Sequence, residues 1–416
     1  MMRTEAGYAM NESLLQGVRE SLDRFIPWLE RFGETSQDQQ DFYAGSAGRM
    51  AKALYYRRKW LGTFAVMPMV FCEAVVPSAR RFFHPRMRLP IADAHYAMGF
   101  ALMFRATGKR AHYERAVHFL EELKQTRCPG YRFACWGYPF DWQTRNGIIR
   151  AGTPLVTTVP YCYEAFEYVY RIDRKDEWRD MLRSIAEHTL LDYRDVPSGP
   201  DAATCTYTPH GGQGVVNASA YRAFLLMSAA REFNDERFSR AAVQNLNFVL
   251  QSQEPDGAWP YSVDGTRDFV DHFHTCFVLK GIAKIEKMTG HPGCRRALQK
   301  GVEYYLLRLF DDLGLPMPFS RAPRMTVYKR ELYDYAECLN LGMLLRGSFP
   351  SLDEKVERVV TDLLEHWMKR DGSFRSRKLI LGYDNVPMHR WGQSEIFRSL
   401  SLVLADGVGS EVSATN

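Results

Sequence analysis

Two kinds of apolar pattern alternate along the chain. In one kind, apolar residues form a single stripe beside a charged face, and these segments follow short breaks at Gly108, Asp173, Asn234, Gly290 and Pro350. In the other kind, residues are apolar on most faces, at 94–106, 159–172, 216–233, 273–288 and 335–346. A helix that is apolar all round is buried, whereas a helix with one apolar stripe lies at the surface. The pattern therefore predicts alternating inner and outer helices, with breaks that recur every 56 to 65 residues.

The two ends of the chain complete this repeat. A sixth inner helix, at 391–405, has no outer helix after it, and an amphipathic segment at 11–32 has no inner helix before it. Pairing these two segments closes a ring of six helical hairpins, whereas an open solenoid would need a cap at each end, and none is found. We therefore predict an all-α fold, an (α/α)6 toroid whose N-terminal helix closes the ring. It spans residues 1–416 as a single domain, with flexible tails at 1–10 and 408–416.

The connections between helices differ in length according to their direction. Inner-to-outer connections are tight, whereas outer-to-inner connections are long, at 127–158, 192–215, 254–271, 311–332 and 371–390. In a toroid all of the long connections share one rim. Long structured loops gathered on one face of a rigid scaffold are where function usually sits. We therefore expect the functional site at this rim.

Composition and charge limit the classes of partner and the compartment. The chain has 54 basic and 49 acidic residues, a net charge of +5, without a dense basic run, which disfavours nucleic acid but allows an acidic glycan. Its eight cysteines are scattered without a CxxC pair, as expected of buried free thiols in a reducing compartment. Neither a signal peptide nor a run of about 18 apolar residues occurs. We therefore predict a cytoplasmic protein without a transmembrane segment; the sequence does not predict its oligomeric state.

Aromatic rings and planar polar groups alternate in the long connections. Sugars stack their C–H faces on rings and hydrogen-bond through their hydroxyls, so a carbohydrate substrate or glycan intermediate is the expected ligand. The alternative role of Trp136, Tyr138 and Trp142 is to pin a long loop to the rim. The candidate substrate-binding residues are Trp136, Tyr138, Trp142, Tyr207, Trp259, Tyr261, Tyr335, Arg390, Trp391 and Gln393.

One pair of residues stands out as candidate chemistry. His274 is expected in the first turn of the fourth inner helix, with Asp271 as its N-cap, so that the imidazole faces the opening of the ring. An imidazole there is a natural general acid or base, although a structural histidine is the competing interpretation. His272 and Asp268 lie nearby, but their spacing matches no zinc motif, and we expect neither a metal nor another cofactor. The candidate catalytic residues are Asp141, His210, Asp271, His274, Asp334 and Glu337.

The sequence leaves the reaction open. A glycan hydrolase needs two carboxylates in one cleft, which Asp141, Asp271, Asp334 and Glu337 could supply. A uronate epimerase or polysaccharide lyase instead moves a proton next to a carboxyl group, for which Tyr207, His210, Tyr261, His274 and Arg390 are suited. A glycan-binding or scaffold protein without activity is the main alternative from another class.

Three segments carry a resemblance to known proteins. The loop DGAWPYS, the helix DFVDHFHTCFVLKGI and the late helix MHRWGQSEIFRSL resemble toroid proteins associated with bacterial polysaccharide biosynthesis. More distantly, the chain is similar to terpenoid-cyclase and prenyltransferase toroids and to the helical domain of glucuronyl C5-epimerases. The first resemblance implies an enzyme of bacterial surface polysaccharide metabolism, with hydrolase ranked before epimerase or lyase. At the positions of Cys276 and His272, that family more often has Gly and Asn, and the Asp-x-Cys zinc pattern of prenyltransferases is absent.

Overall fold

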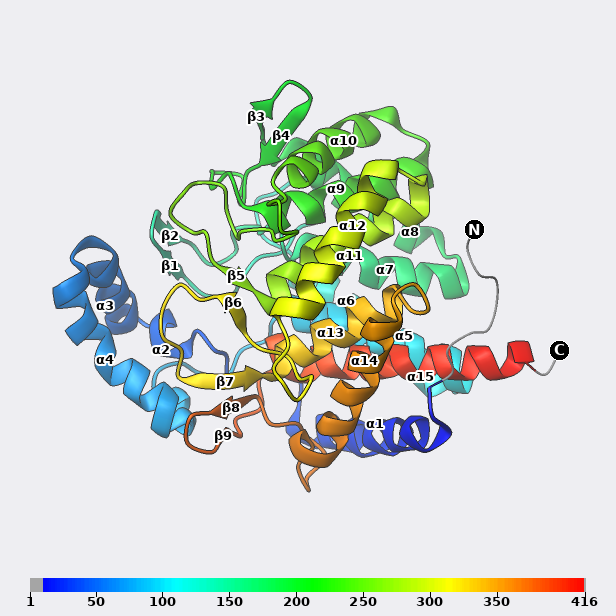
Figure 1. Ribbon diagram of the computed structural model, residues 1–416, viewed down its shortest axis with the longest axis horizontal. Helices are drawn as coiled ribbons and strands as arrows, with labels where there is room; N and C mark the ends of the chain where they lie inside the picture. The colour runs from blue at the N-terminus through cyan, green and yellow to red at the C-terminus, as the bar shows by residue number, and fades with distance from the viewer. Residues whose placement is uncertain (1–9, 415–416) are drawn as a thin grey trace.

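The computed structural model describes residues 10–414, in which inner and outer helices alternate around a closed ring (Figure 1). Each inner helix contacts the next, and the last contacts the first, which confirms the predicted all-α (α/α)6 toroid. The inner helices are α5 (Pro90–Thr107), α7 (Val159–Asp173), α9 (Val216–Phe233), α11 (His272–Thr289), α13 (Leu332–Leu344) and α15 (Ser394–Ala414). The outer helices are α6 (Arg110–Gln125), α8 (Asp176–Leu191), α10 (Glu236–Gln251), α12 (Pro292–Arg308), α14 (Pro350–Asp362) and α1 (Glu12–Phe32).

The predicted breaks between helices have a clear backbone cause. Gly108, Asn234 and Gly290 each end an inner helix in the left-handed conformation, with φ of 68°, 51° and 66°. Glycine and asparagine tolerate this conformation better than other residues, so these positions terminate the helix at little cost. The second break, predicted at Asp173, differs by one residue, because Arg174 takes the left-handed position with φ of 56°.

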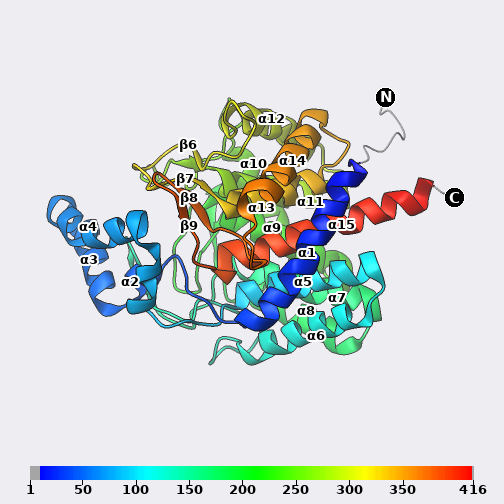
Figure 2. The same cartoon turned by 90° about the horizontal axis from the view of Figure 1, so that it is seen from below.

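The ring closes where α1 packs against α15, as Figure 2 shows. Phe25 on α1 stacks on Phe397 of α15, with centroids 5.2 Å apart. Phe397 in turn fits against Gly99 of α5, where a Cβ atom would lie 2.6 Å from its ring. Helix α15 continues to Ala414, so residues 408–414 are helical and not the flexible tail that the sequence suggested. Residues 1–9 and 415–416 of the expected tails lie outside the described part of the chain.

An arm at residues 41–82 is an element that the sequence pattern did not predict. It consists of α2 (Asp41–Ala44), α3 (Ser46–Arg57), α4 (Lys59–Val75) and a short 3-10 helix (Pro77–Phe82). Helices α3 and α4 approach so closely at Gly62 that a Cβ atom there would lie 2.0 Å from the backbone of Tyr55. Two ion pairs fix the arm to the rim: Arg80 with Asp384 at 2.6 Å and Glu73 with Arg377 at 2.6 Å.

Short strands join the long connections into a continuous rim, at the same end of the molecule as the arm (Figures 1 and 2). The hairpins β1–β2 and β3–β4 each lie within one connection, whereas β5 pairs with β6, and β7 with β8, across neighbouring connections. Backbone pairing therefore holds the loops in place, which the sequence pattern alone did not predict. The strands are β1 (Trp142–Thr144), β2 (Gly147–Ile149), β3 (Asp195–Gly199), β4 (Ala202–Cys205), β5 (Val270–Asp271), β6 (Phe319–Arg321), β7 (Tyr328–Glu331), β8 (Arg377–Leu379) and β9 (Tyr383–Asp384).

Two general expectations can be compared with the described residues. All eight cysteines are free thiols, and all but Cys72 are buried. Between residues 10 and 414, no helix combines the length and the apolar character needed to traverse a lipid bilayer.

His272, which the sequence placed near a possible metal site, is a buried packing residue at the start of α11. Its Nδ1–H donates to the carbonyl oxygen of Leu309 at 3.2 Å, and its Nε2 accepts from the hydroxyl of Tyr305 at 2.7 Å. Burial lowers the pKa of this imidazole to about 3, so it stays neutral in the folded protein.

This lowered pKa makes stability depend on pH. Because the unfolded chain binds a proton at His272 near pH 6.5 and the folded chain does not, the contribution is complete above pH 6.5 and falls as the pH drops toward 3. When the pH is lowered from 7.5 to 5, the unfolding free energy of the wild type should fall by about 2 kcal/mol more than that of His272→Gln. Urea denaturation at both pH values measures this difference. The exposed His210→Gln is the matched control, and equal pH dependence of both variants would contradict the assignment.

Candidate functional site

Rings from five junctions of the rim form a belt around the mouth of the toroid. Before α7, the ring of Tyr138 lies 5.7 Å from that of Trp142, which lies 6.3 Å from the ring of Tyr207 before α9. Before α11, Tyr261 contacts His274 edge to face at 4.7 Å. We define the aromatic belt as Tyr138, Trp142, Tyr207, Tyr261, Phe273, His274, Tyr333 and Trp391.

The other half of the belt comes from the first turns of three inner helices. Phe273 lies 5.0 Å from Tyr333 at the start of α13, and Tyr333 stacks on Trp391 at 5.8 Å. The guanidinium of Arg390 closes the circle, because it lies 3.7 Å from the ring of Trp391 and 4.2 Å from that of Tyr138. The belt thus joins four of the predicted connections and the start of α15 in one place.

Arg390 brings a buried positive charge to the belt. Its side chain is fully buried, and its Nε donates to Asp38 at 2.8 Å, while Nη2 donates to the other oxygen of the same carboxylate at 2.5 Å. Nη1 is also buried but has no hydrogen-bond partner among the described residues. A buried donor without a partner is costly, so Nη1 is a natural site for an acceptor oxygen of a ligand.

Asp271 and His274 form a hydrogen-bonded dyad at the start of α11. Asp271 is buried and caps the helix as expected, since its Oδ1 accepts the backbone N–H of His274 at 2.9 Å. Its Oδ2 accepts the ring Nδ1–H of the same histidine at 2.6 Å. This bond leaves Nε2 as the acceptor nitrogen of the neutral ring, and no residue in the described part of the chain bonds to it. The side chain of His274 is 21% exposed, so Nε2 is within reach of a ligand.

Asp334, in the first turn of α13, is a carboxyl group without a partner. It is 1% exposed, and neither oxygen has a hydrogen-bond partner among the described residues. Burial, together with the nearby carboxylates of Glu331 and Asp271, raises its pKa well above the ordinary value. Asp334 therefore holds a proton near neutral pH, whereas the neighbouring carboxylate of Asp271 is hydrogen-bonded to His274.

The backbone is strained where Trp391 enters the belt. Residues His389–Gln393 form a kinked turn before α15, in which Trp391 has φ of 58°, in the left-handed region, at a cost of about 1 kcal/mol or more. His389 braces one side through Tyr96 (2.6 Å) and the carbonyl of Gly33 (2.9 Å). Gln393 braces the other side, because it bonds to both backbone polar groups of Phe374. The turn places the indole of Trp391 against the ring of Tyr333.

Beneath the belt, a cluster of buried charges forms the floor of the mouth. Lys280 of α11 pairs with Glu337 of α13 at 2.6 Å. Glu395 of α15 contacts Nε2 of His95 at 2.5 Å and accepts from Asn340 at 2.9 Å. Burial, only partly offset by Lys280, raises the pKa of Glu337 to about 7. Burial lowers the pKa of His95 well below its usual range, so this imidazole is neutral.

A second group of charges continues the floor toward α7. Glu164 pairs with Lys284 of α11 and lies 3.8 Å from Nη2 of Arg398 on α15. Burial opposes ionisation of Glu164, but Lys284 and Arg398 outweigh it and lower its pKa to about 2. Tyr161 and Tyr221 share a hydrogen bond between their hydroxyls above these charges, and both are buried. The floor is therefore mostly buried, with Lys284 partly exposed, and its positive and negative side chains are paired across four inner helices.

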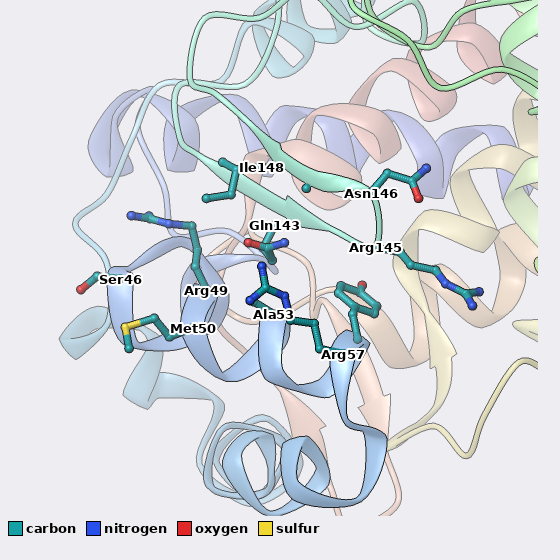
Figure 3. A pocket seen from close by; sticks show the side chains of 11 residues that line it. Ser46, Arg49, Met50, Ala53, Arg57, Gln143, Arg145, Asn146 and Ile148 are labelled. Atoms are coloured by element: carbon teal, nitrogen blue, oxygen red, sulfur yellow. The ribbon is translucent and has the colours of Figure 1, made fainter.

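A separate cavity of about 630 Å³ opens between α3 and the β1–β2 hairpin (Figure 3). Its lining includes Arg49, Arg57 and Arg145, and Arg49 extends from α3 toward the hairpin. Successive side chains of a strand point to opposite faces, so Gln143 lines this cavity while Trp142 joins the aromatic belt. Asp141, a predicted catalytic residue, lies beside it, bonded to Arg150 (2.9 Å) and to the backbone N–H of Ala151 (3.0 Å). These bonds lower the pKa of Asp141, and they give its side chain a structural role in this loop.

The structure separates the predicted site residues into two groups. Tyr138, Trp142, Tyr207, Tyr261, Asp271, His274, Asp334, Arg390 and Trp391 lie in or against the aromatic belt. Glu337 lies in the closed floor beneath it, with no exposed surface.

The remaining predicted residues serve the packing of the fold instead. Trp136 and Trp259 are buried, and their indole N–H groups donate to the carbonyls of Leu123 and Val249. These bonds give both rings the loop-pinning role. Tyr335 is buried on the outer side, where its hydroxyl donates to Asp362 at 2.7 Å. Gln393 is buried against Phe374, and His210 is exposed on a turn.

Several residues of the floor escaped the sequence-based prediction, namely His95, Lys280, Lys284, Glu164 and Arg398. The signal that could have found them is a charged residue inside a helix that is otherwise apolar all round. Such a charge must meet a partner from another inner helix, because an unpaired buried charge is costly. In the described part of the chain, no three His, Cys, Asp or Glu side chains are grouped so that they could hold a metal ion.

The comparisons with known proteins bear on the fold. No protein-family model and no curated protein matches the sequence. A solved cellobiose 2-epimerase from Bacillus thermoamylovorans B4167 is similar in structure, with a TM-score of 0.65 at 10% identity over 95% of this chain and 100% of the other. A D-mannose isomerase gives 0.62 at 11% identity over 98% and 100%. An unsaturated glucuronyl hydrolase from Bacillus sp. GL1 gives 0.57 at 13% identity over 93% and 96%. At these identities, the likeness establishes the (α/α)6 toroid as the fold of this chain.

Proposed function

We propose that this protein is a sugar-converting enzyme that moves a proton at a carbon next to a carbonyl or carboxyl group, as in epimerisation or isomerisation. The observation that carries the proposal is the Asp271–His274 dyad, in which Nε2 has no hydrogen-bond partner among the described residues and the ring packs against Tyr261 of the aromatic belt. A neutral imidazole with a fixed tautomer is a suitable base for abstracting a C–H proton.

The belt accounts for binding of a sugar. Its rings offer flat apolar faces for the C–H side of a pyranose, and Trp142, Tyr207 and Trp391 remain partly exposed. The Nη1 of Arg390 can donate to a carbonyl, carboxylate or enolate oxygen of the ligand, which would satisfy its own missing hydrogen bond. A carbohydrate is therefore the ligand class that fits the site.

The proposed reaction proceeds in two proton transfers. His274 Nε2 takes the proton from the carbon next to the carbonyl, and the electron pair of the C–H bond moves onto the carbonyl oxygen to give an enolate. Arg390 stabilises the negative charge on that oxygen. Return of a proton to the other face of the same carbon gives the epimer. Return of a proton to the former carbonyl carbon, with transfer of the adjacent hydroxyl proton to the enolate oxygen, gives the isomer.

The proton donor for the second step is proposed to be a tyrosine of the belt. Burial raises the pKa of Tyr207 well above its usual value, and the hydroxyl contacts Oγ1 of Thr157 at 3.1 Å. Tyr207 therefore keeps its proton at neutral pH; the raised pKa makes it a weaker acid, and its place in the belt is what suggests it as the donor. Among solved proteins of similar fold, the epimerases and the D-mannose isomerase are consistent with this chemistry, while an unsaturated glucuronyl hydrolase and a polysaccharide lyase share the same fold.

Glycan hydrolysis, which the sequence ranked first, becomes the second candidate. One observation favours it: Asp334 holds a proton beside Asp271, and a hydrolase needs one carboxylic acid and one carboxylate. Hydrolysis ranks second because the Asp271 carboxylate is already hydrogen-bonded to His274 and because Glu337 has no exposed surface. Association with bacterial surface polysaccharide metabolism and a cytoplasmic location stay predictions from the sequence.

The first test follows products with a panel of neutral and acidic sugars. We expect an epimer or isomer of unchanged mass, detected by NMR, and His274→Gln should lower the rate by about 1,000-fold because the base is lost. Asp271→Asn no longer fixes the tautomer of His274 and should lower the reaction rate by about 100-fold or more. His210→Gln, an exposed histidine outside the belt, is the control and should retain full activity.

Four results of this experiment would contradict the proposal. Products heavier by one water would identify hydrolysis, and products with ultraviolet absorbance would identify elimination. Full activity of His274→Gln would remove this residue from the mechanism, and binding of a sugar without any product would favour a non-catalytic protein.

The second test separates the two candidate reactions through Asp334. Asp334→Asn keeps the shape and neutrality of the protonated side chain but cannot donate an acidic proton. If proton transfer by His274 is the reaction, this variant should stay within about tenfold of the wild-type rate, whereas loss of a general acid costs about 100- to 10,000-fold. A loss of the larger size, measured as kcat on the same sugar, would favour hydrolysis through Asp334.

A further inference from the structure

The arm carries a stripe of large apolar side chains on its outer face. Trp60, Phe64, Met67 and Phe71 are 72%, 57%, 49% and 60% exposed. Their spacing of four, three and four residues along α4 places them within about 60° of one another around the helix. We call these four residues the apolar stripe.

The opposite face of α4 is already occupied. Met69 packs into the small core of the arm with Phe42 and Ala51, and Gly62 lies against α3. Glu73 is held by Arg377 of β8 at 2.6 Å. The apolar stripe therefore faces away from the toroid, and contiguous exposed apolar surface of this kind marks an interaction site.

The arm also concentrates positive charge. The arm, residues 41–82, contains seven basic residues and two acidic residues, Asp41 and Glu73, whereas the rest of the chain has 47 basic and 47 acidic residues. Arg57, Arg58 and Lys59 are exposed just before the stripe, and Arg81 is exposed beyond the end of α4. The net positive charge of the whole protein thus arises from this arm.

We propose that the apolar stripe and its flanking cations dock on the surface of an anionic lipid membrane. Large aromatic residues flanked by arginine and lysine are the composition of helices that lie in the membrane interface. In this arrangement α4 lies flat, because its other face is packed, and Trp60, Phe64 and Phe71 enter the boundary between headgroups and acyl chains. The cations at both ends contact lipid phosphates.

Charge argues against a second copy of this chain as the occupant. Both ends of the stripe carry cations, while Glu73 of the arm is already paired and Asp41 is buried, so two stripes brought together would meet like charges. An anionic surface complements the same pattern. Because the arm lies at the rim end of the toroid, docking brings the aromatic belt close to the membrane surface (Figures 1 and 2).

Sedimentation of the full-length protein with lipid vesicles tests this proposal. We expect binding to vesicles of equal parts phosphatidylglycerol and phosphatidylcholine to be at least about tenfold tighter than to phosphatidylcholine alone, and to weaken as salt is added. Trp60→Ser with Phe71→Ser should weaken binding by about tenfold or more, and Arg58→Gln with Lys59→Gln should do the same. Leu191→Ser with Leu307→Ser, two exposed leucines on outer helices, is the matched control and should bind like the wild type.

Circular dichroism and light scattering complete the test. The charge variant alters only exposed side chains, so its helical content should match the wild type even if the apolar variant folds poorly. Equal binding to both vesicle types, or no binding, would overturn the proposal. A wild-type dimer that the apolar variant converts to a monomer would overturn it in favour of self-association.

Discussion

The pairing of buried charges along the axis of the ring is the constraint on which the site depends. Lys284 and Arg398 both bind Glu164, and Lys280 binds Glu337, so these contacts join α7, α11, α13 and α15. Leaving one such charge without its partner costs about 3–5 kcal/mol, and each helix must therefore keep its height relative to the others. Glu337 lies four residues, about 6 Å, below Tyr333 in α13, and Glu395 opens α15 directly after the turn that carries Trp391. Fixing the charges thus sets the heights of the segments that carry these two rings of the belt.

Above this floor, the molecule carries features that packing alone does not require. Trp391 takes a left-handed backbone conformation, and within residues 10–414 neither Nη1 of Arg390 nor the buried carboxyl oxygens of Asp334 have a hydrogen-bond partner. Each feature costs stability, and all three lie against the same aromatic belt. A polar ligand that accepts from Arg390 would recover part of this cost. The His274 imidazole, already oriented by Asp271, is the group best placed to act on such a ligand.

Residue patterns predicted the toroid well because its determinants are local. The apolar character of each inner helix and the left-handed ends at Gly108, Asn234 and Gly290 are visible in the sequence, as are Asp271 as a cap and His274 in the first turn. Long-range pairing was not visible. Nothing near Trp136 or Trp259 in the sequence distinguishes a ring that pins its loop from a ring that lines the mouth, such as Trp142. The sequence pattern did not predict the arm, because its apolar residues face outward, where a pattern based on burial expects polar residues.

The central claim is that His274 removes a carbon-bound proton from a sugar held in the aromatic belt. Running the reaction in heavy water and following the sugar by NMR tests this claim most directly. The account predicts that product, and recovered substrate, gain one deuterium at the carbon next to the carbonyl or carboxyl group, and that His274→Gln abolishes the exchange. Conversion to product without carbon-bound deuterium in either sugar, together with oxygen-18 incorporation from labelled water, would contradict it.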